Sequence, residues 1–304
     1  MYEKILVSLD GSQLSECVLP CARTFAATLK IPVELLHVIE PETLMPSVVV
    51  QHGRYVDVFT GEKESGGDYL KKIATSFAEP SLVNCCVEVG NSAEVIVDRA
   101  AANSTTLIAM TTHGRSGINR WLLGSIADKV LHAASNPLLL VRATAESKKT
   151  DTPPLKRIMV PLDGSPLAEM VLPHAAELAR KMGLEIVLTR VFGVPTPVFA
   201  EDYGPYVEEL WEQVEKEAQE YLDEKARQLQ AQGLTNVSAL SVAGFAAEKI
   251  IEMARQRSDT LIAMSTHGRS GVNRWVMGSV TDRVVRHSGD PVLIIRAPSQ
   301  SSTN

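Results

Sequence analysis

The sequence is poor in cysteine and has no long apolar run, and these absences exclude several classes of protein. Its four cysteines form no CxxC pair, and one helical turn between Cys17 and Cys21 does not by itself define a metal site. We expect Cys17 and Cys21 to be small buried hydrophobic residues. No apolar run approaches the ~18 residues of a membrane-spanning helix, and no signal-peptide pattern precedes the first strand. We therefore expect a cytoplasmic protein without membrane contact.

The chain also has no net positive charge and lacks two familiar nucleotide-binding motifs. The formal net charge is −6, and both halves of the chain are mildly acidic, so electrostatics give no reason to expect nucleic-acid binding. The chain contains neither GxxxxGK followed by Ser or Thr nor GxGxxG after a strand. Readings as a P-loop kinase or a Rossmann dehydrogenase therefore lose their main support.

What the sequence does contain is a long internal repeat. The segment Leu107–Ser125 returns nearly unchanged as Leu261–Ser279, and Val7–Ser12 returns as Val160–Ser165. A repeat whose period is the size of a domain predicts two domains of one type, each of roughly 150 residues.

The boundaries of these domains follow from composition. A polar segment that ends in two prolines is typical of an exposed linker, and the polar C-terminal residues are typical of a disordered tail. We predict one domain over residues 1–146, a linker over 147–154, a second domain over 155–298 and a tail over 299–304.

Each copy alternates short apolar strands with helices. In the first copy we predict strands over 4–9, 33–39, 83–89, 106–110 and 137–142, and helices over 15–29, 68–77, 92–102 and 125–134. Prolines and glycines predict a loop over 40–66. The second copy repeats this order with a longer middle helix, over 206–232. The alternation predicts an α/β fold with a parallel sheet covered on both faces, and ligands in such folds bind at the carboxyl ends of the strands.

The start of the helix at Ser125 is a candidate anion site. Ser125 followed by Asp128 resembles a capping box, and the orphan N–H groups and positive dipole end of a helix attract anions. Gly124 lets a phosphate approach the backbone with no Cβ in the way. The second copy repeats the pattern at Gly278 and Ser279. For this fragment alone, a simple helix cap is an equal alternative.

A glycine-containing loop precedes each of these helices. Gly114 and Gly117 permit positive φ, so that successive N–H groups can line an anion-binding concavity, and Arg115 supplies charge for phosphate oxygens. The matching residues of the second copy are Gly268, Arg269 and Gly271. A flexible loop with solvated arginines is the alternative. The near-identity of the two loops favours binding, since nothing structural requires the same loop twice.

Asp10 and Asp163 follow the first strand of each copy. A carboxylate there can accept a hydrogen bond from a base amino group or bind a metal, and it can equally cap the following helix. His113 and His267 have no evident carboxylate or cysteine partner to complete a triad. The sequence therefore predicts no catalytic residue, and it leaves any metal ligands unknown.

These motifs resemble the universal stress protein family in its tandem-domain form. Nucleotide-binding members of that family carry Gly-x2-Gly-x9-Gly-Ser/Thr, and both copies match its second half through Gly114 with Gly124-Ser125 and Gly268 with Gly278-Ser279. The resemblance covers essentially the whole chain.

One departure from the family pattern is shared by both copies. Thr111 and Ser265 stand where the pattern has its first glycine. A side chain at that position crowds the ribose or the triphosphate, so each site must be judged separately.

The resemblance implies two five-stranded parallel sheets of the adenine nucleotide alpha hydrolase-like type. It implies that the two domains pair through their last strands as a pseudo-dimer within one chain, with homodimers of the whole chain also expected. It also implies ATP or another adenine nucleotide as ligand, accompanied by Mg²⁺. The aspartate, valine and methionine positions would contact the base and ribose, and the glycine turns the phosphates. With the loop residues above, the predicted site of the first copy is Asp10, Val38, Met110, Gly114, Arg115, Gly117, Gly124, Ser125 and Ile126. That of the second copy is Asp163, Val191, Met264, Gly268, Arg269, Gly271, Gly278, Ser279 and Val280.

Three functions are compatible with this sequence. The first is an ATP-binding regulator or sensor in a stress response, with little or no turnover. The second is a weak ATPase that uses the same pockets, since hydrolysis needs an oriented water and stabilised charge that the sequence does not demand. The third is an interaction module that has lost nucleotide binding through Thr111 and Ser265.

Overall fold

The computed structural model describes residues 1–41, 55–112, 123–143, 155–193, 200–266 and 277–296, with side chains from residue 59 in the helix that begins at Tyr55 and from residue 209 in the helix that begins at Ala200. The chain divides into two compact units, Met1–Thr152 and Pro153–Asn304. Each unit is described by itself.

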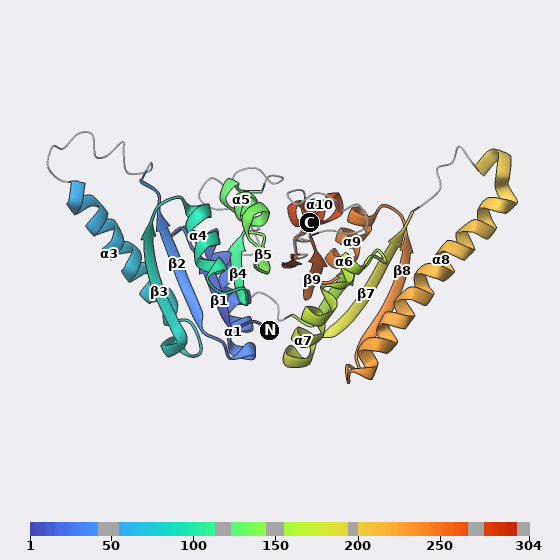
Figure 1. The fold of residues 1–304 in the computed structure, drawn as a ribbon, viewed down its shortest axis with the longest axis horizontal. Helices are drawn as coiled ribbons and strands as arrows, with labels where there is room; N and C mark the ends of the chain where they lie inside the picture. Colours follow the sequence, from blue (N-terminus) through green and yellow to red (C-terminus); the bar gives the residue numbers. More distant parts are fainter. Residues whose placement is uncertain (42–54, 113–122, 144–154, 194–199, 267–276, 297–304) are drawn as a thin grey trace, which may run out of the picture. The chain divides into compact units, whose positions relative to one another are not determined.

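The first unit alternates strands and helices (Figure 1). Its elements are β1 (Lys4–Ser8), the 3₁₀ helix η1 (Ser15–Val18), α1 (Leu19–Leu29), β2 (Val33–Ile39), α3 (Tyr55–Ala74), the 3₁₀ helix η2 (Pro80–Leu82), β3 (Val83–Val89), α4 (Ser92–Ala101), β4 (Thr106–Thr111), α5 (Ser125–Ala133) and β5 (Leu138–Val141). The expected order is confirmed.

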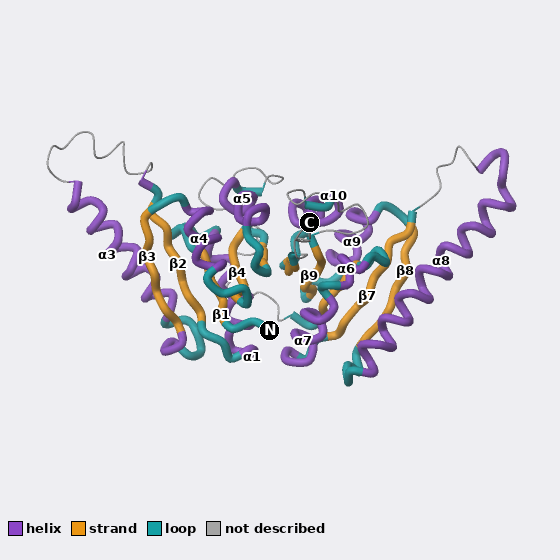
Figure 2. The backbone as a smooth tube through the Cα atoms, viewed as in Figure 1, coloured by secondary structure: helices purple, strands orange, loops and turns teal. Residues whose placement is uncertain are grey.

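The second unit repeats this order (Figure 2). Its elements are β6 (Arg157–Pro161), α6 (Pro166–Glu169), α7 (Leu172–Met182), β7 (Glu185–Phe192), α8 (Ala200–Ala231), β8 (Val237–Ala243), α9 (Ala246–Arg255), β9 (Thr260–Ser265), α10 (Ser279–His287) and β10 (Val292–Ile295).

Each unit contains five parallel strands with its first strand in the middle. The order is β3-β2-β1-β4-β5 in the first unit and β8-β7-β6-β9-β10 in the second. The central strand β1 is an unbroken apolar run, and Ile5, Leu6 and Val7 are fully buried. A parallel strand covered on both faces requires such a run. The predicted α/β fold with five-stranded parallel sheets is therefore confirmed.

The helices cover opposite faces of each sheet. Tyr69 of α3 donates a hydrogen bond to Glu16 of η1 over 3.0 Å, so these elements share one face, while α4 and α5 pack together. Right-handed crossovers produce this division, because the chain moves one way from β1 to β3 and the other way from β4 to β5. In the second unit Tyr221 of α8 donates to Glu169 of α6 over 2.8 Å.

The sequence reading was wrong for part of the segment over 40–66. Residues 55–66 are helical, because α3 begins at Tyr55, and residues 42–54 lie outside the described part of the chain. The prediction failed because it treats Gly61 and Gly66 as helix breakers, whereas packing on β2 and β3 stabilises the helix.

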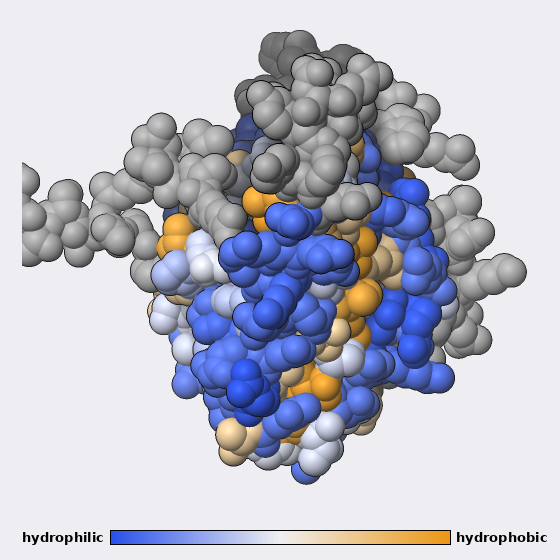
Figure 3. All heavy atoms as spheres, turned by 90° about the vertical axis from the view of Figure 1, so that its right-hand side faces the viewer, coloured by the Kyte–Doolittle hydropathy of each residue, from blue (hydrophilic) through white to orange (hydrophobic). Residues whose placement is uncertain are grey.

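The long helix α8 is amphipathic. Its buried residues Ala218, Leu222, Ala226 and Leu229 follow helical spacing and face β7 and β8. Figure 3 looks onto this end of the molecule, which is largely hydrophilic with hydrophobic residues gathered in bands. No helix in the described ranges is long and apolar enough to cross a membrane.

The expectation that Cys17 and Cys21 are buried is confirmed, and burial raises the pKa of the Cys21 thiol to about 12. Cys85 is exposed and Cys86 is intermediate. Both lie on β3, an outer strand of its unit, where alternate side chains face less completely covered surface.

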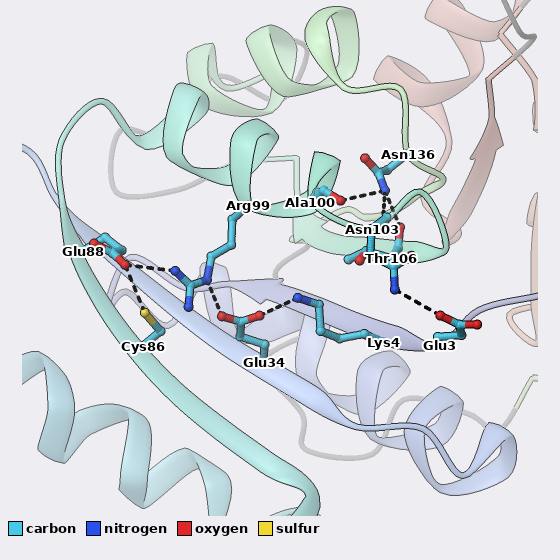
Figure 4. Close-up of polar contacts among 10 residues, drawn as sticks. All are labelled: Glu3, Lys4, Glu34, Cys86, Glu88, Arg99, Ala100, Asn103, Thr106 and Asn136. Atoms are coloured by element: carbon cyan, nitrogen blue, oxygen red, sulfur yellow. Dashed lines mark hydrogen bonds and ion pairs between the residues drawn. The ribbon is translucent and has the colours of Figure 1, made fainter.

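Two groups of paired polar side chains lie inside the first unit (Figure 4). Glu34 of β2 bonds Lys4 at 2.7 Å and also Arg99 of α4, which reaches on to Glu88 at 2.9 Å. The buried side chain of Asn136 donates to three backbone carbonyls, those of Ala100, Asn103 and Thr106, over 3.1, 2.9 and 3.2 Å. These bonds tie the end of α4 and the start of β4 to the segment before β5.

The second unit has Asp290 where the first has Asn136, and this exchange makes its stability depend on pH. Asp290 is only 9% exposed, and burial raises its pKa to about 6, against the opposing hydrogen bond with Ser288. In the folded state Asp290 therefore keeps a proton that it loses near pH 4 in the unfolded state. Its contribution lowers the free energy of unfolding as pH rises from about 4 to 6.

We predict that Asp290→Asn stabilises the protein by about 1–2 kcal/mol at pH 7 and by much less at pH 4. The reverse exchange, Asn136→Asp, should destabilise it most at pH 7, since it places a carboxylate among three carbonyl oxygens. Denaturant midpoints at the two pH values measure both effects. An equal gain from Asp290→Asn at both pH values would contradict the prediction.

Candidate functional site

A pocket opens at the carboxyl ends of β1, β2 and β4 in the first unit. Its volume is about 450 Å³, which lies within the ~300–1,000 Å³ range of small-molecule sites. It occupies the place where the strand order reverses, between β1 and β4. Six of the predicted site residues lie in its wall: Asp10, Val38, Met110, Gly124, Ser125 and Ile126.

The turn after β1 fixes the position of Asp10. Its carboxylate accepts a hydrogen bond from the Ser12 backbone N–H over 2.9 Å, and its own N–H donates to Ser15 Oγ over 3.3 Å. In the second unit Asp163 Oδ1 accepts from both the N–H and the hydroxyl of Ser165, over 2.9 and 2.7 Å. Each aspartate thus closes an Asx turn. The helix-cap alternative for Asp163 was wrong, because Ser165 caps α6.

The start of α5 forms another wall of the pocket. Gly124 is the N-cap residue with φ −60° and ψ 146°, and its N–H donates to Thr112 O over 2.7 Å. Ser125 is the first helical residue and no side chain caps the helix, so the predicted capping box was wrong. The N–H groups of a first helical turn have no partner within their own helix. Those of Ser125 and Ile126 therefore sit at the pocket with the positive end of the helix dipole.

The second unit has the same arrangement at the start of α10, around a smaller pocket. Gly278 caps α10 without a side-chain bond, and its N–H donates to Thr266 O over 2.8 Å. The pocket has a volume of about 190 Å³ and a more apolar wall, which includes Pro161 and Ile250. The predicted residues in its wall are Asp163, Val191, Met264, Gly278, Ser279 and Val280.

Six predicted residues belong to the loops before α5 and α10. These are Gly114, Arg115, Gly117, Gly268, Arg269 and Gly271, together with the histidines His113 and His267, and all lie outside the described residues. Their predicted roles stay predictions.

Sequence reasoning missed several polar residues of the first pocket. His37, Glu40 and Glu62 line it along with Ser15 and Ser92. His37 precedes Val38 at the end of β2, so its place at the carboxyl edge was a usable signal. Glu62 carried no such signal, because it lies in the segment 40–66, for which the sequence predicts a loop.

His37 is held in a fixed orientation. Its Nδ1 lies 2.8 Å from Leu9 O, and since a carbonyl only accepts, Nδ1 carries the proton and donates it. The edge of its ring meets Tyr69 of α3, with ring centroids 6.2 Å apart. Gly66 faces the ring from α3: a Cβ there would come within 2.9 Å of His37 Cδ2. The glycine therefore lets α3 approach the pocket closely.

The model of the universal stress protein family matches this chain twice, over residues 1–142 and 154–296. The chain belongs to the universal stress protein family. The two matches fall on the two units and together span nearly all of the described strands and helices.

Relatives with the same tandem organisation cover the full chain. A universal stress protein of Mycolicibacterium smegmatis is 26% identical over 305 residues, covering 96% of each chain, and one of Mycobacterium tuberculosis is 24% identical with the same coverage. The crystal structure of a universal stress protein from Archaeoglobus fulgidus superposes with a TM-score of 0.70 at 20% identity, over 97% of this chain and 99% of that one. That likeness shows a shared fold.

The departures from the family's glycine pattern lie directly in the pocket walls. Thr111 and Ser265 end β4 and β9, are buried, and line the first and second pockets. The Ser265 carbonyl accepts from Thr281 Oγ1 over 2.9 Å, while the Ser265 hydroxyl has no hydrogen-bond partner among the described residues. This universal stress protein thus has a hydroxyl, in place of a glycine, at the same corner of each pocket.

Two neighbouring glycines of α3 allow a matched test of the pocket wall. A Cβ at Gly67 meets nothing within 4 Å, so Gly67→Ala should stabilise the protein by about 0.5–1 kcal/mol through helix propensity. Gly66→Ala should lose that gain and destabilise by about 1 kcal/mol, since the methyl group displaces His37 from Leu9 O. Thermal denaturation measures both. Equal stabilisation by the two variants would show that His37 is not held as described.

Proposed function

We propose that this universal stress protein is a regulator or sensor that binds an adenine nucleotide in its pockets, with little or no turnover. The observation that carries the proposal is the pocket of the first unit, where Asp10, Val38 and the start of α5 converge at the carboxyl edge of the sheet. Its 450 Å³ fit a nucleotide, and the free N–H groups of α5 suit a phosphate.

In this proposal each wall of the pocket has its own task. The carboxylate of Asp10 and the backbone of Val38 accept hydrogen bonds from the base, and Met110 packs against base and ribose. Gly124, Ser125 and Ile126 bind phosphate oxygens through N–H and hydroxyl groups. The second unit uses its equivalent residues.

ATP with Mg²⁺ is the form of the ligand that we propose. No three His, Cys, Asp or Glu side chains of the described ranges are grouped so that they could hold a metal ion. The protein would then hold the cation through the phosphates, and the ion would neutralise charge between them.

The proposal extends to location and assembly. We place the protein in the cytoplasm, in a stress response, with β5 and β10 pairing the units as a pseudo-dimer and whole chains forming homodimers. A weak ATPase is the second candidate.

The proposal is tested by denaturing the purified protein and quantifying released nucleotide by chromatography, followed by titration with ATP and Mg²⁺. We expect adenine nucleotide, two per chain if both pockets bind and one if only the larger does. No released nucleotide and no binding on titration would contradict the proposal and favour an interaction module.

The variants Gly124→Val and Gly278→Val show which pocket binds the nucleotide. Both positions have φ near −60°, which any residue adopts, so a side chain adds bulk without backbone strain. We expect each variant to lose the nucleotide of its own unit and keep that of the other. An ATPase activity that survives both changes would come from a contaminant.

A further inference from the structure

The two pockets differ in charge as well as in volume, and the charge difference lies in the described walls. The loops before α5 and α10 lie outside the described residues and are nearly identical in sequence, with the same charged residues at matching positions. Asp10 and Asp163 likewise match each other. What remains is a set of polar residues in the wall of the first pocket whose counterparts put no polar side chain into the wall of the second.

Strand register establishes which residues correspond. Ser8 of β1 pairs with Leu36 of β2, and Pro161 of β6 pairs with Thr189 of β7. Leu36 and Thr189 therefore correspond. One residue later His37 corresponds to Arg190, and four residues later, just after each strand, Glu40 corresponds to Gly193. The backbone agrees, since Gly90 N donates to Ile39 O and Gly244 N donates to Phe192 O, over 3.1 and 2.9 Å.

The long helices align through their tyrosines. Tyr69 and Tyr221 make the same bond, to Glu16 and Glu169 respectively. Seven residues earlier, Glu62 of α3 corresponds to Val214 of α8. The exchanges from first to second unit are therefore Ser8 to Pro161, Ser15 to Ala168, His37 to Arg190, Glu40 to Gly193, Glu62 to Val214 and Ser92 to Ala246.

The first pocket thus carries two carboxylates that the second lacks. Glu40 is partly buried and its Oε1 accepts from the Ser92 N–H over 3.3 Å, which points the carboxylate toward the start of α4. Glu62 is an exposed side chain that also lines the pocket. The counterpart of His37, Arg190, lies 4.9 Å from the ring centre of Tyr221 and is not part of the wall of the second pocket.

From the charge difference between the two pockets we infer that Glu40 and Glu62 are specificity-determining residues. They make the first pocket prefer adenine ligands with few phosphates over cation-free ATP. The second pocket has no such preference. The inference rests on the proposed nucleotide binding and adds to it a preference. Each carboxylate repels an unneutralised phosphate by an amount that depends on distance and salt. A neutral nucleoside makes no such contribution, and a divalent cation bound to the phosphates reduces the repulsion.

The experiment compares ATP with adenosine in calorimetric titrations of the full chain, at low salt and with a chelator that removes divalent cations. A Gly278→Val background limits binding to the first pocket. In this background Glu40→Gln together with Glu62→Gln should tighten ATP binding about 5-fold or more, with adenosine changed by less than 2-fold. Both substitutions are nearly isosteric, and an amide oxygen at residue 40 still accepts from Ser92.

A reciprocal variant in the other unit serves as the matched control. Ala246 lines the second pocket and is partly exposed, so in a Gly124→Val background Ala246→Glu should weaken ATP binding about 2- to 3-fold and leave adenosine unchanged. Both effects should shrink in high salt and when Mg²⁺ is added.

The outcomes separate this inference from the function on which it rests. If neither ATP nor adenosine binds the unaltered protein, the proposed function is wrong and the selectivity falls with it. If both ligands bind and the double variant leaves the ratio of their affinities unchanged, nucleotide binding stands and the inference is overturned. Equal changes for both ligands would also overturn it, because they indicate a steric effect.

Discussion

Burial of the first strand of each unit between two parallel neighbours is the constraint on which the rest of the structure depends. β1 lies between β2 and β4, and β6 between β7 and β9. The chain must then leave the central strand toward one side and return on the other, with helices on opposite faces. The two sets of connections separate at the carboxyl edge of the central strand, and the pocket of each unit lies there.

The two units share this strand order and helix arrangement but differ in several polar residues. Asp290 stands where Asn136 satisfies three carbonyls, and it remains buried at a cost that depends on pH. Asn91 caps α4 through its side chain, whereas Phe245 begins α9 without a cap and is 75% exposed. Such exchanges are tolerated because sheet order and helix packing come from the apolar residues. The polar residues around the pockets were therefore free to diverge.

Much of this organisation could be predicted from the sequence. The strands at Val33–Ile39 and Val83–Val89 followed from their apolar residues. The helix over 55–66 could not be predicted, since its stability comes from contacts with distant strands and its glycines argue against it. Asp10 was placed at the pocket by its strand end, but Glu62 reaches the pocket only through that missed helix. The Asx turn and the uncapped start of α5 depend on local backbone geometry that residue types alone left open.

Hydrogen–deuterium exchange in the presence and absence of ATP tests the central claim most directly. The account predicts slower exchange at the first helical turns, at Ser125–Ala127 and at Ser279–Thr281, because their N–H groups would bind phosphate. It also predicts little change at the amino ends of the strands, away from both pockets. Saturating ATP that binds without slowing exchange at either helix start would contradict the account.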